Sequence, residues 1–95
     1  MGQSLGSQQM ALYRAIDEVL HYVWDPIGVS RAPEARDEYH SYLPQVLNLL
    51  RSGADESGIA NYLSSVTAYM GLNPEPERDL EIARVLLRWK QVIGE

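Results

Sequence analysis

Apolar residues recur at intervals of three and four positions in four separate segments, which is the period of an α-helix with one buried face. The first of these helices is predicted over residues 8–23, with an apolar stripe made of Leu12, Ile16, Val19, Leu20 and Val23. Its polar residues, Asp17 and His21 among them, share the opposite face and are expected to contact solvent. Because the alternation of a β-strand fits neither set, the chain is predicted to be all-helical.

The second helix is predicted to begin at Pro33, since proline suits the first turn of a helix. Its apolar stripe consists of Tyr39, Tyr42, Leu43, Val46 and Leu50. Pro44 lies within the stripe, where it removes a backbone donor and crowds the preceding turn. We therefore expect the helix to be kinked or broken near Pro44 and to end at Gly53.

The third helix is predicted between an N-cap at Asp55 and a C-terminal glycine at Gly71. Asn73 and Pro74 would then supply the N-cap and the first-turn proline of the fourth helix. Apolar side chains cover more than half the circumference of this last helix, so it is expected to be the most buried. The apolar side chains are Leu80, Ile82, Ala83, Val85, Leu86, Leu87, Trp89, Val92 and Ile93.

Short connections at residues 53–55 and 71–73 predict that neighbouring helices run antiparallel. The expected architecture is a compact four-helix bundle that forms a single domain over residues 1–95. Residues 1–8, which are rich in Gly, Ser and Gln, are expected to be a flexible lead-in.

Composition removes several classes of function. The chain has no cysteine, which excludes disulfides, thiolate catalysis and thiolate metal sites. Its net charge is −5 and its eight basic residues are scattered, so we expect no nucleic-acid binding. There is no apolar run of bilayer length and no signal-peptide pattern, so we expect no membrane association and a cytoplasmic location.

The search for catalytic groups leads to the prediction that the chain is not an enzyme and carries no cofactor. There is no G-x-S-x-G elbow and no glycine-rich phosphate loop. Two acid–histidine pairs have helical spacing and could together present metal ligands, namely Asp17 with His21 and Asp37 with His40. Such spacings are common on helices, where they form ion pairs, and we favour that interpretation.

The most specific motif is the turn at residues 24–28, in which Asp25, Pro26 and Gly28 suit the first, second and fourth places of a type I turn. One interpretation is structural, with Asp25 accepting hydrogen bonds from the backbone ahead of it. The other is a partner-binding groove lined by Trp24, Asp25, Ile27, Glu38, Tyr39, His40 and Tyr42. All aromatic residues of the chain are Tyr or Trp, which are enriched at surfaces that are partly apolar and partly in contact with water.

Three motifs resemble a family of small bacterial proteins of unknown function, and the resemblance covers residues 12–87. The first is the W-D-P-I-G signature at Trp24, Asp25, Pro26, Ile27 and Gly28. The second is a D-E-Y-x-x-Y segment at Asp37, Glu38, Tyr39 and Tyr42. The third comprises Gly53, Ala54, Ile59, Tyr62 and Leu63. The resemblance implies an all-helical fold and a bacterial source, and it implies no activity.

By elimination, the leading hypothesis is a non-catalytic protein-binding module, an immunity-like protein or adaptor that binds a basic partner. The alternative is a small-ligand or metal-binding protein that uses His40, Asp37 and the tyrosines beside the turn. A monomer is favoured, because a wide apolar arc suits the central helix of a bundle. A homodimer through Val85, Trp89 and Val92 is left open.

Overall fold

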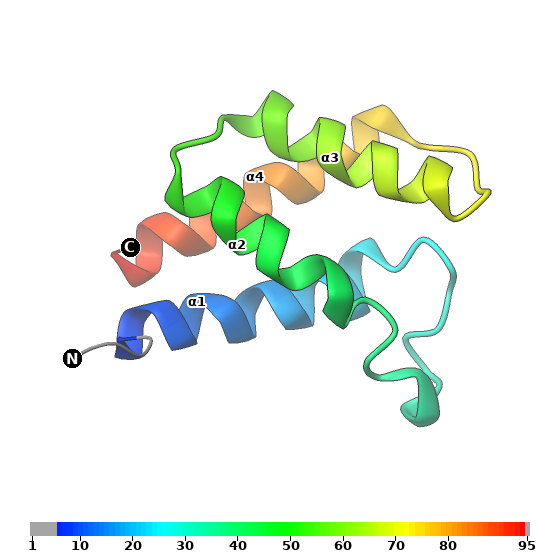
Figure 1. The fold of residues 1–95 in the computed structure, drawn as a ribbon, viewed down its shortest axis with the longest axis horizontal. Coiled ribbons are helices and arrows are strands. Elements are labelled where there is room, and N and C mark those ends of the chain that lie inside the picture. The colour runs from blue at the N-terminus through cyan, green and yellow to red at the C-terminus, as the bar shows by residue number, and fades with distance from the viewer. Residues whose placement is uncertain (1–5, 95) are drawn as a thin grey trace.

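The computed structural model describes residues 6–94, and the fold is all-helical, as predicted (Figure 1). The four main helices are α1 (Ser7–Glu18), α2 (Leu43–Arg51), α3 (Glu56–Tyr69) and α4 (Pro76–Ile93). Three shorter helical turns are η1 (Val19–Trp24), η2 (Pro33–Ala35) and η3 (His40–Tyr42). Within residues 6–94 there is no β-strand.

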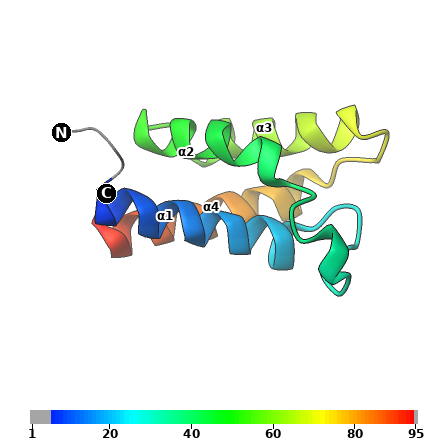
Figure 2. The same ribbon diagram turned by 60° about the horizontal axis from the view of Figure 1, so that its bottom comes forward.

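The helices form two layers, with α1 and α4 in one and α2 and α3 in the other (Figure 2). Consecutive helices run in opposite directions (Figure 1), which the short connections had predicted for α2 with α3 and for α3 with α4. The start of α1 and the end of α4 lie together, where the Gln8 side-chain amide donates to the carbonyl of Ile93 at 3.2 Å. One apolar core fills the space between the layers, and its fully enclosed side chains include Leu12, Leu20, Leu50, Leu63 and Leu86.

Two of the predicted helix ends are confirmed in atomic detail. Asp55 caps α3 by accepting the N–H of Gly58 at 2.9 Å. After α3, Gly71 adopts a φ of 84°, and the N–H of Leu72 donates to the carbonyl of Thr67 at 3.1 Å. The first bond pairs an N–H at the start of α3, and the second pairs a carbonyl at its end, that would otherwise lack an intrahelical partner.

The start of α4 was predicted two residues too early. The helix begins at Pro76, and Glu75 is its N-cap residue. A residue that precedes proline is forced out of the helical region by contact with the proline ring, and Glu75 has an extended φ of −121°. A helix starting at Pro74 would require Glu75 to be helical, so the second proline sets the boundary.

The predicted break near Pro44 is confirmed. The segment from Pro33 does not form a continuous helix but two short 3₁₀ turns, η2 and η3, followed by α2. Pro44 lies in the first turn of α2, where its missing N–H has no intrahelical partner to lose. The proline therefore starts a helix after the break, rather than bending one through it.

The face assignment at the end of the first helix was wrong for two residues. His21, predicted to be exposed, is buried, and Val23, predicted to be buried, is 44% exposed. The cause is the π-helical turn η1, in which the N–H of Asp25 bonds to the carbonyl of Leu20, five residues back. A π turn adds a residue to the helical repeat and so rotates the residues after it away from the α-helical register.

The prediction that the fourth helix is the most buried was also wrong. Helix α4 is central, since it contacts α1, α2, α3 and η1. It nevertheless buries a single face, whose members are Asp79, Ile82, Ala83 and Leu86. Val85, Trp89 and Val92 lie outside this buried face and are exposed.

Helix α1 begins at Ser7, so residues 7 and 8 of the predicted lead-in are helical. Residues 1–5 of that lead-in lie outside the described residues. None of the helices in residues 6–94 combines the length and the apolar character needed to span a membrane.

A buried polar junction links three of these elements. The carboxylate of Asp79 on α4 accepts the indole N–H of Trp24 at 3.1 Å and the hydroxyl of Ser64 on α3 at 2.7 Å. Asp79 is only 2% exposed, so both donors are needed to replace the water it loses. Beside it, the Arg78 guanidinium donates to the carbonyls of Val23 and Trp24 at the end of η1.

We predict that Asp79→Ala destabilises the protein by about 2–3 kcal/mol, because it leaves the Trp24 indole N–H buried without an acceptor. Urea unfolding followed by circular dichroism measures this loss. The matched control is Asp37→Ala, which removes an exposed carboxylate and should change stability by less than about 0.5 kcal/mol. Equal effects of the two substitutions would show that the junction has no special role.

Candidate functional site

The turn predicted at residues 24–28 is present, and Asp25 organises it. The N–H of Gly28 bonds to the carbonyl of Asp25 at 3.2 Å, which closes the turn. The Asp25 carboxylate accepts three backbone N–H groups, those of Gly28 at 3.0 Å, Val29 at 2.8 Å and Ser30 at 3.0 Å. Asp25 itself has a φ of 35°, in the left-handed region that Asp tolerates better than most residues.

Tyr39 connects this turn to a later part of the segment between α1 and α2. Its hydroxyl donates to the Asp25 carboxylate at 2.7 Å and accepts the N–H of Ile27 at 3.0 Å. The Tyr39 ring lies 5.3 Å from the Trp24 ring, and both side chains are 2% exposed. Trp24 and Tyr39, which are distant in sequence, therefore pack together in the core and support the turn.

The pKa values of Asp25 and Tyr39 reflect this arrangement. Burial acts to raise the pKa of Asp25, but the hydrogen bonds from Val29, Tyr39 and Ser30 together outweigh it, and the pKa is lowered. Burial, reinforced by the hydrogen bond to Asp25, raises the pKa of Tyr39. Asp25 is thus held as a carboxylate and Tyr39 as a neutral hydroxyl, the two forms that the hydrogen bond requires.

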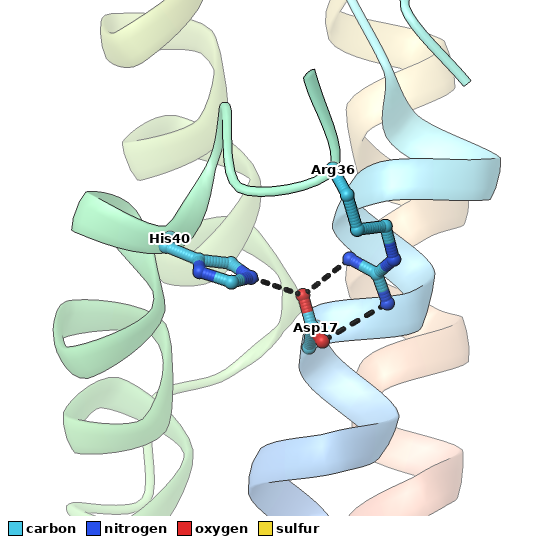
Figure 3. A network of polar contacts seen from close by, with 3 residues as sticks. All are labelled: Asp17, Arg36 and His40. Atoms are coloured by element: carbon cyan, nitrogen blue, oxygen red, sulfur yellow. Dashed lines mark hydrogen bonds and ion pairs between the residues drawn. The ribbon is translucent and has the colours of Figure 1, made fainter. Parts of the chain in front are cut away.

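A second set of polar contacts joins the loop to α1 (Figure 3). The guanidinium of Arg36 makes paired bonds to Asp17 at 2.9 and 3.0 Å, and Nε2 of His40 lies 3.1 Å from the same carboxylate. Arg36 also lies over the Tyr22 ring, 5.2 Å from its centre. The bonds to Asp17 raise the pKa of Arg36. Because one carboxylate receives groups from both ends of the segment 36–40, this segment is fixed against α1.

The two acid–histidine pairs considered as metal ligands do not form. His21 is in the core, with Nδ1 lacking a hydrogen-bond partner in the described chain, and His40 contacts Asp17 rather than the side chain of Asp37. The N–H of His40 instead bonds to the backbone carbonyl of Asp37. Among residues 6–94, no group of three or more His, Asp or Glu side chains is arranged to hold a metal ion.

The seven residues predicted to line a partner-binding groove fall into three groups by exposure. Trp24 and Tyr39 are buried, and their polar atoms are paired within the chain, so they offer no surface to a partner. Asp25 and Tyr42 are partly buried, whereas Ile27, Glu38 and His40 are exposed. The first group supports the loop, and the exposed group forms its outer surface.

Residues 25–42 form what we call the acidic loop. Besides Ile27 and Glu38, it exposes the carboxylates of Glu34 and Asp37. Sequence reasoning missed Asp17 and Arg36 as its anchor, because residues 19 positions apart on different elements leave no periodic signal. The clustering of Glu34, Asp37 and Glu38 is visible in the sequence, where it also suits the start of a helix.

Comparison with known proteins adds nothing to this picture, because no family model, curated protein or solved structure matches the chain.

Removing the Tyr39 hydroxyl tests the attachment of the loop. Tyr39→Phe should cost about 1–3 kcal/mol of unfolding free energy, since the N–H of Ile27 loses its acceptor and Asp25 loses a donor. Denaturant titration measures the loss. Tyr69→Phe is the control, because Tyr69 is 84% exposed and its substitution should be neutral. A neutral result for Tyr39→Phe would contradict the role of this hydroxyl.

The lowered pKa of Asp25 predicts a pH-dependent contribution to stability. The ionised carboxylate stabilises the fold fully above its unfolded pKa, near 3.8, and loses this contribution as pH falls through the lower folded value. Asp25→Asn, which keeps a residue that tolerates positive φ, should therefore be less stable than the wild type at pH 7. The deficit should shrink as the pH is lowered below about 4. Unfolding curves over this pH range measure it, and a deficit that does not vary with pH would refute the assignment.

Proposed function

We propose that this protein is a non-catalytic protein-binding module that presents the acidic loop to a basic protein partner. The observation that carries the proposal is that the acidic loop is anchored to the helices by hydrogen bonds while its outer surface is exposed. The loop projects from one end of the helical bundle (Figure 1). Tyr39 and Asp25 hold its first half, Asp17 and Arg36 hold its second, and Ile27 remains 43% exposed.

Such a loop suits recognition on energetic grounds. Its backbone is already ordered by hydrogen bonds, so binding would not have to meet the full entropic cost of ordering it. Ile27 provides an apolar contact, and Tyr22, which is 57% exposed and contacts Arg36 of the loop through its ring, adds aromatic surface. An aromatic or aliphatic anchor surrounded by charge is typical of protein interfaces.

Charge supports a basic partner. The chain carries a net charge of −5, and Glu34, Asp37 and Glu38 gather exposed carboxylates on the loop. A surface of this sign would steer a basic protein towards it and repel acidic ones. We further propose that the protein acts in the bacterial cytoplasm in an immunity-like or adaptor role. Of this proposal, the resemblance to proteins with a W-D-P-I-G signature supports the bacterial source alone.

Affinity capture with loop variants tests the proposal. The wild-type protein, immobilised, should retain a basic protein from bacterial lysate and release it when salt is raised, because exposed charges are screened. Glu38→Lys and Ile27→Ser should each reduce the retained amount about tenfold, equivalent to the loss of one interface contact.

The control for Glu38→Lys is the double variant Asn48→Lys with Asn61→Lys, which makes the same change in net charge at exposed positions on α2 and α3. It should retain the partner at the wild-type level. If a captured protein binds the loop variants and this control equally well, the acidic loop is not the binding surface.

A further inference from the structure

The outward face of α4 carries an apolar surface that no element of residues 6–94 covers. Val85, Trp89 and Val92 follow one another at helical spacings of four and three, and they are 38%, 43% and 67% exposed. With Arg84 and Arg88 they line a surface groove of about 440 Å³. The sequence-based preference for a monomer assumed that this apolar arc would be buried within the bundle. That reason for expecting a monomer is therefore removed.

The two halves of α4 carry exposed side chains of opposite charge. Glu77 and Glu81 are exposed near its start, whereas Arg84 and Arg88 are exposed towards its end. Arg84 pairs with Glu56 on α3 at 2.8 Å. Arg88, Glu77 and Glu81 make no ion pair or hydrogen bond with side chains in the described chain.

We propose that this face binds a second copy of the same chain, with the two α4 helices antiparallel across a twofold axis near residues 84–85. In a twofold interface, each patch meets its own image in reversed order. Glu81 then lies opposite Arg88 of the other copy, and both such pairs are attractive. Val85 and Val92 lie on the same side of the helix as these pairs, with Trp89 at its edge, so the pairing brings this apolar surface against the other copy.

Two features favour a second copy over another occupant. Each half of the helix supplies the charge that the other half lacks, so a single sequence provides both sides of the interface. A parallel pair would place Glu81 against Glu81 and Arg88 against Arg88, which is repulsive. The surface shares no residue with the acidic loop, so the dimer stands independently of the proposed function.

Sedimentation velocity over a range of concentrations gives the first test. The wild-type protein should move from monomer to dimer mass as concentration rises. Trp89→Ala should raise the dissociation constant at least about tenfold, since a tryptophan that becomes buried on association commonly supplies much of the binding energy of an interface. Tyr69→Ala removes an aromatic that is even more exposed, on α3, and should leave the dissociation constant unchanged. A wild-type protein that remains monomeric at the highest concentration would overturn the proposal.

Charge exchange tests the antiparallel arrangement. Glu81→Lys alone should place Lys opposite Arg88, and Arg88→Glu alone should place Glu opposite Glu81, so each variant should dimerise more weakly than the wild type. A mixture of the two variants restores both attractive pairs and should form heterodimers with about the wild-type dissociation constant. Both positions are exposed, and circular dichroism would verify that each variant is folded. Single variants that dimerise as tightly as the wild type would overturn the arrangement.

Discussion

The adjacent side chains of Trp24 and Asp25 hold the structure together at the point where the first helix ends. The Trp24 indole reaches across to Asp79 on α4, which also receives Ser64 from α3. The Asp25 carboxylate accepts hydrogen bonds from backbone N–H groups of the acidic loop and from the Tyr39 hydroxyl. One dipeptide thus joins two helices of the bundle on one side and the loop on the other.

This arrangement separates support from recognition. Two aromatic residues predicted to contact a partner, Trp24 and Tyr39, are buried inside the protein. The surface that remains is made of Ile27 and carboxylates on the acidic loop, and of Val85, Trp89 and Val92 on α4. The first surface carries more acidic than basic side chains and suits a basic partner. Helix α4 exposes both glutamates and arginines, and it suits a second copy of itself.

Much of the fold could be predicted because its determinants are local. Capping by Asp55, the turn at Gly71 and the break before Pro44 each depend on a few neighbouring residues, and each is present. The wrong predictions of exposure arose where residues distant in sequence, or a change of helix type, determine which side chains are buried. The π turn at η1 rotated His21 inwards and Val23 outwards, and nothing in the apolar spacing signals it. The breadth of the apolar arc of α4 did not reveal that one side of it would remain uncovered.

In the candidate site, the turn could be predicted from the sequence, but the long-range hydrogen bonds that anchor the loop could not. Asp25, Pro26 and Gly28 carry the chemistry of a turn in their own side chains and backbone preferences. The bonds from Tyr39 to Asp25 and from Arg36 to Asp17 join residues 14 and 19 positions apart, and only the folded chain brings them together. For the same reason, exposure within the motif could not be read from residue type, since Trp24 is buried and Ile27 is not.

Amide hydrogen exchange of the wild-type protein tests most directly whether the acidic loop is ordered before any partner binds. The N–H groups of Ile27, Val29 and Ser30 donate to Tyr39 and Asp25, so they should exchange at least about a hundredfold more slowly than in an unstructured peptide. The N–H of exposed Glu34, for which no acceptor is present within residues 6–94, should exchange at nearly the unstructured rate. Unprotected amides at Ile27, Val29 and Ser30 would contradict the account.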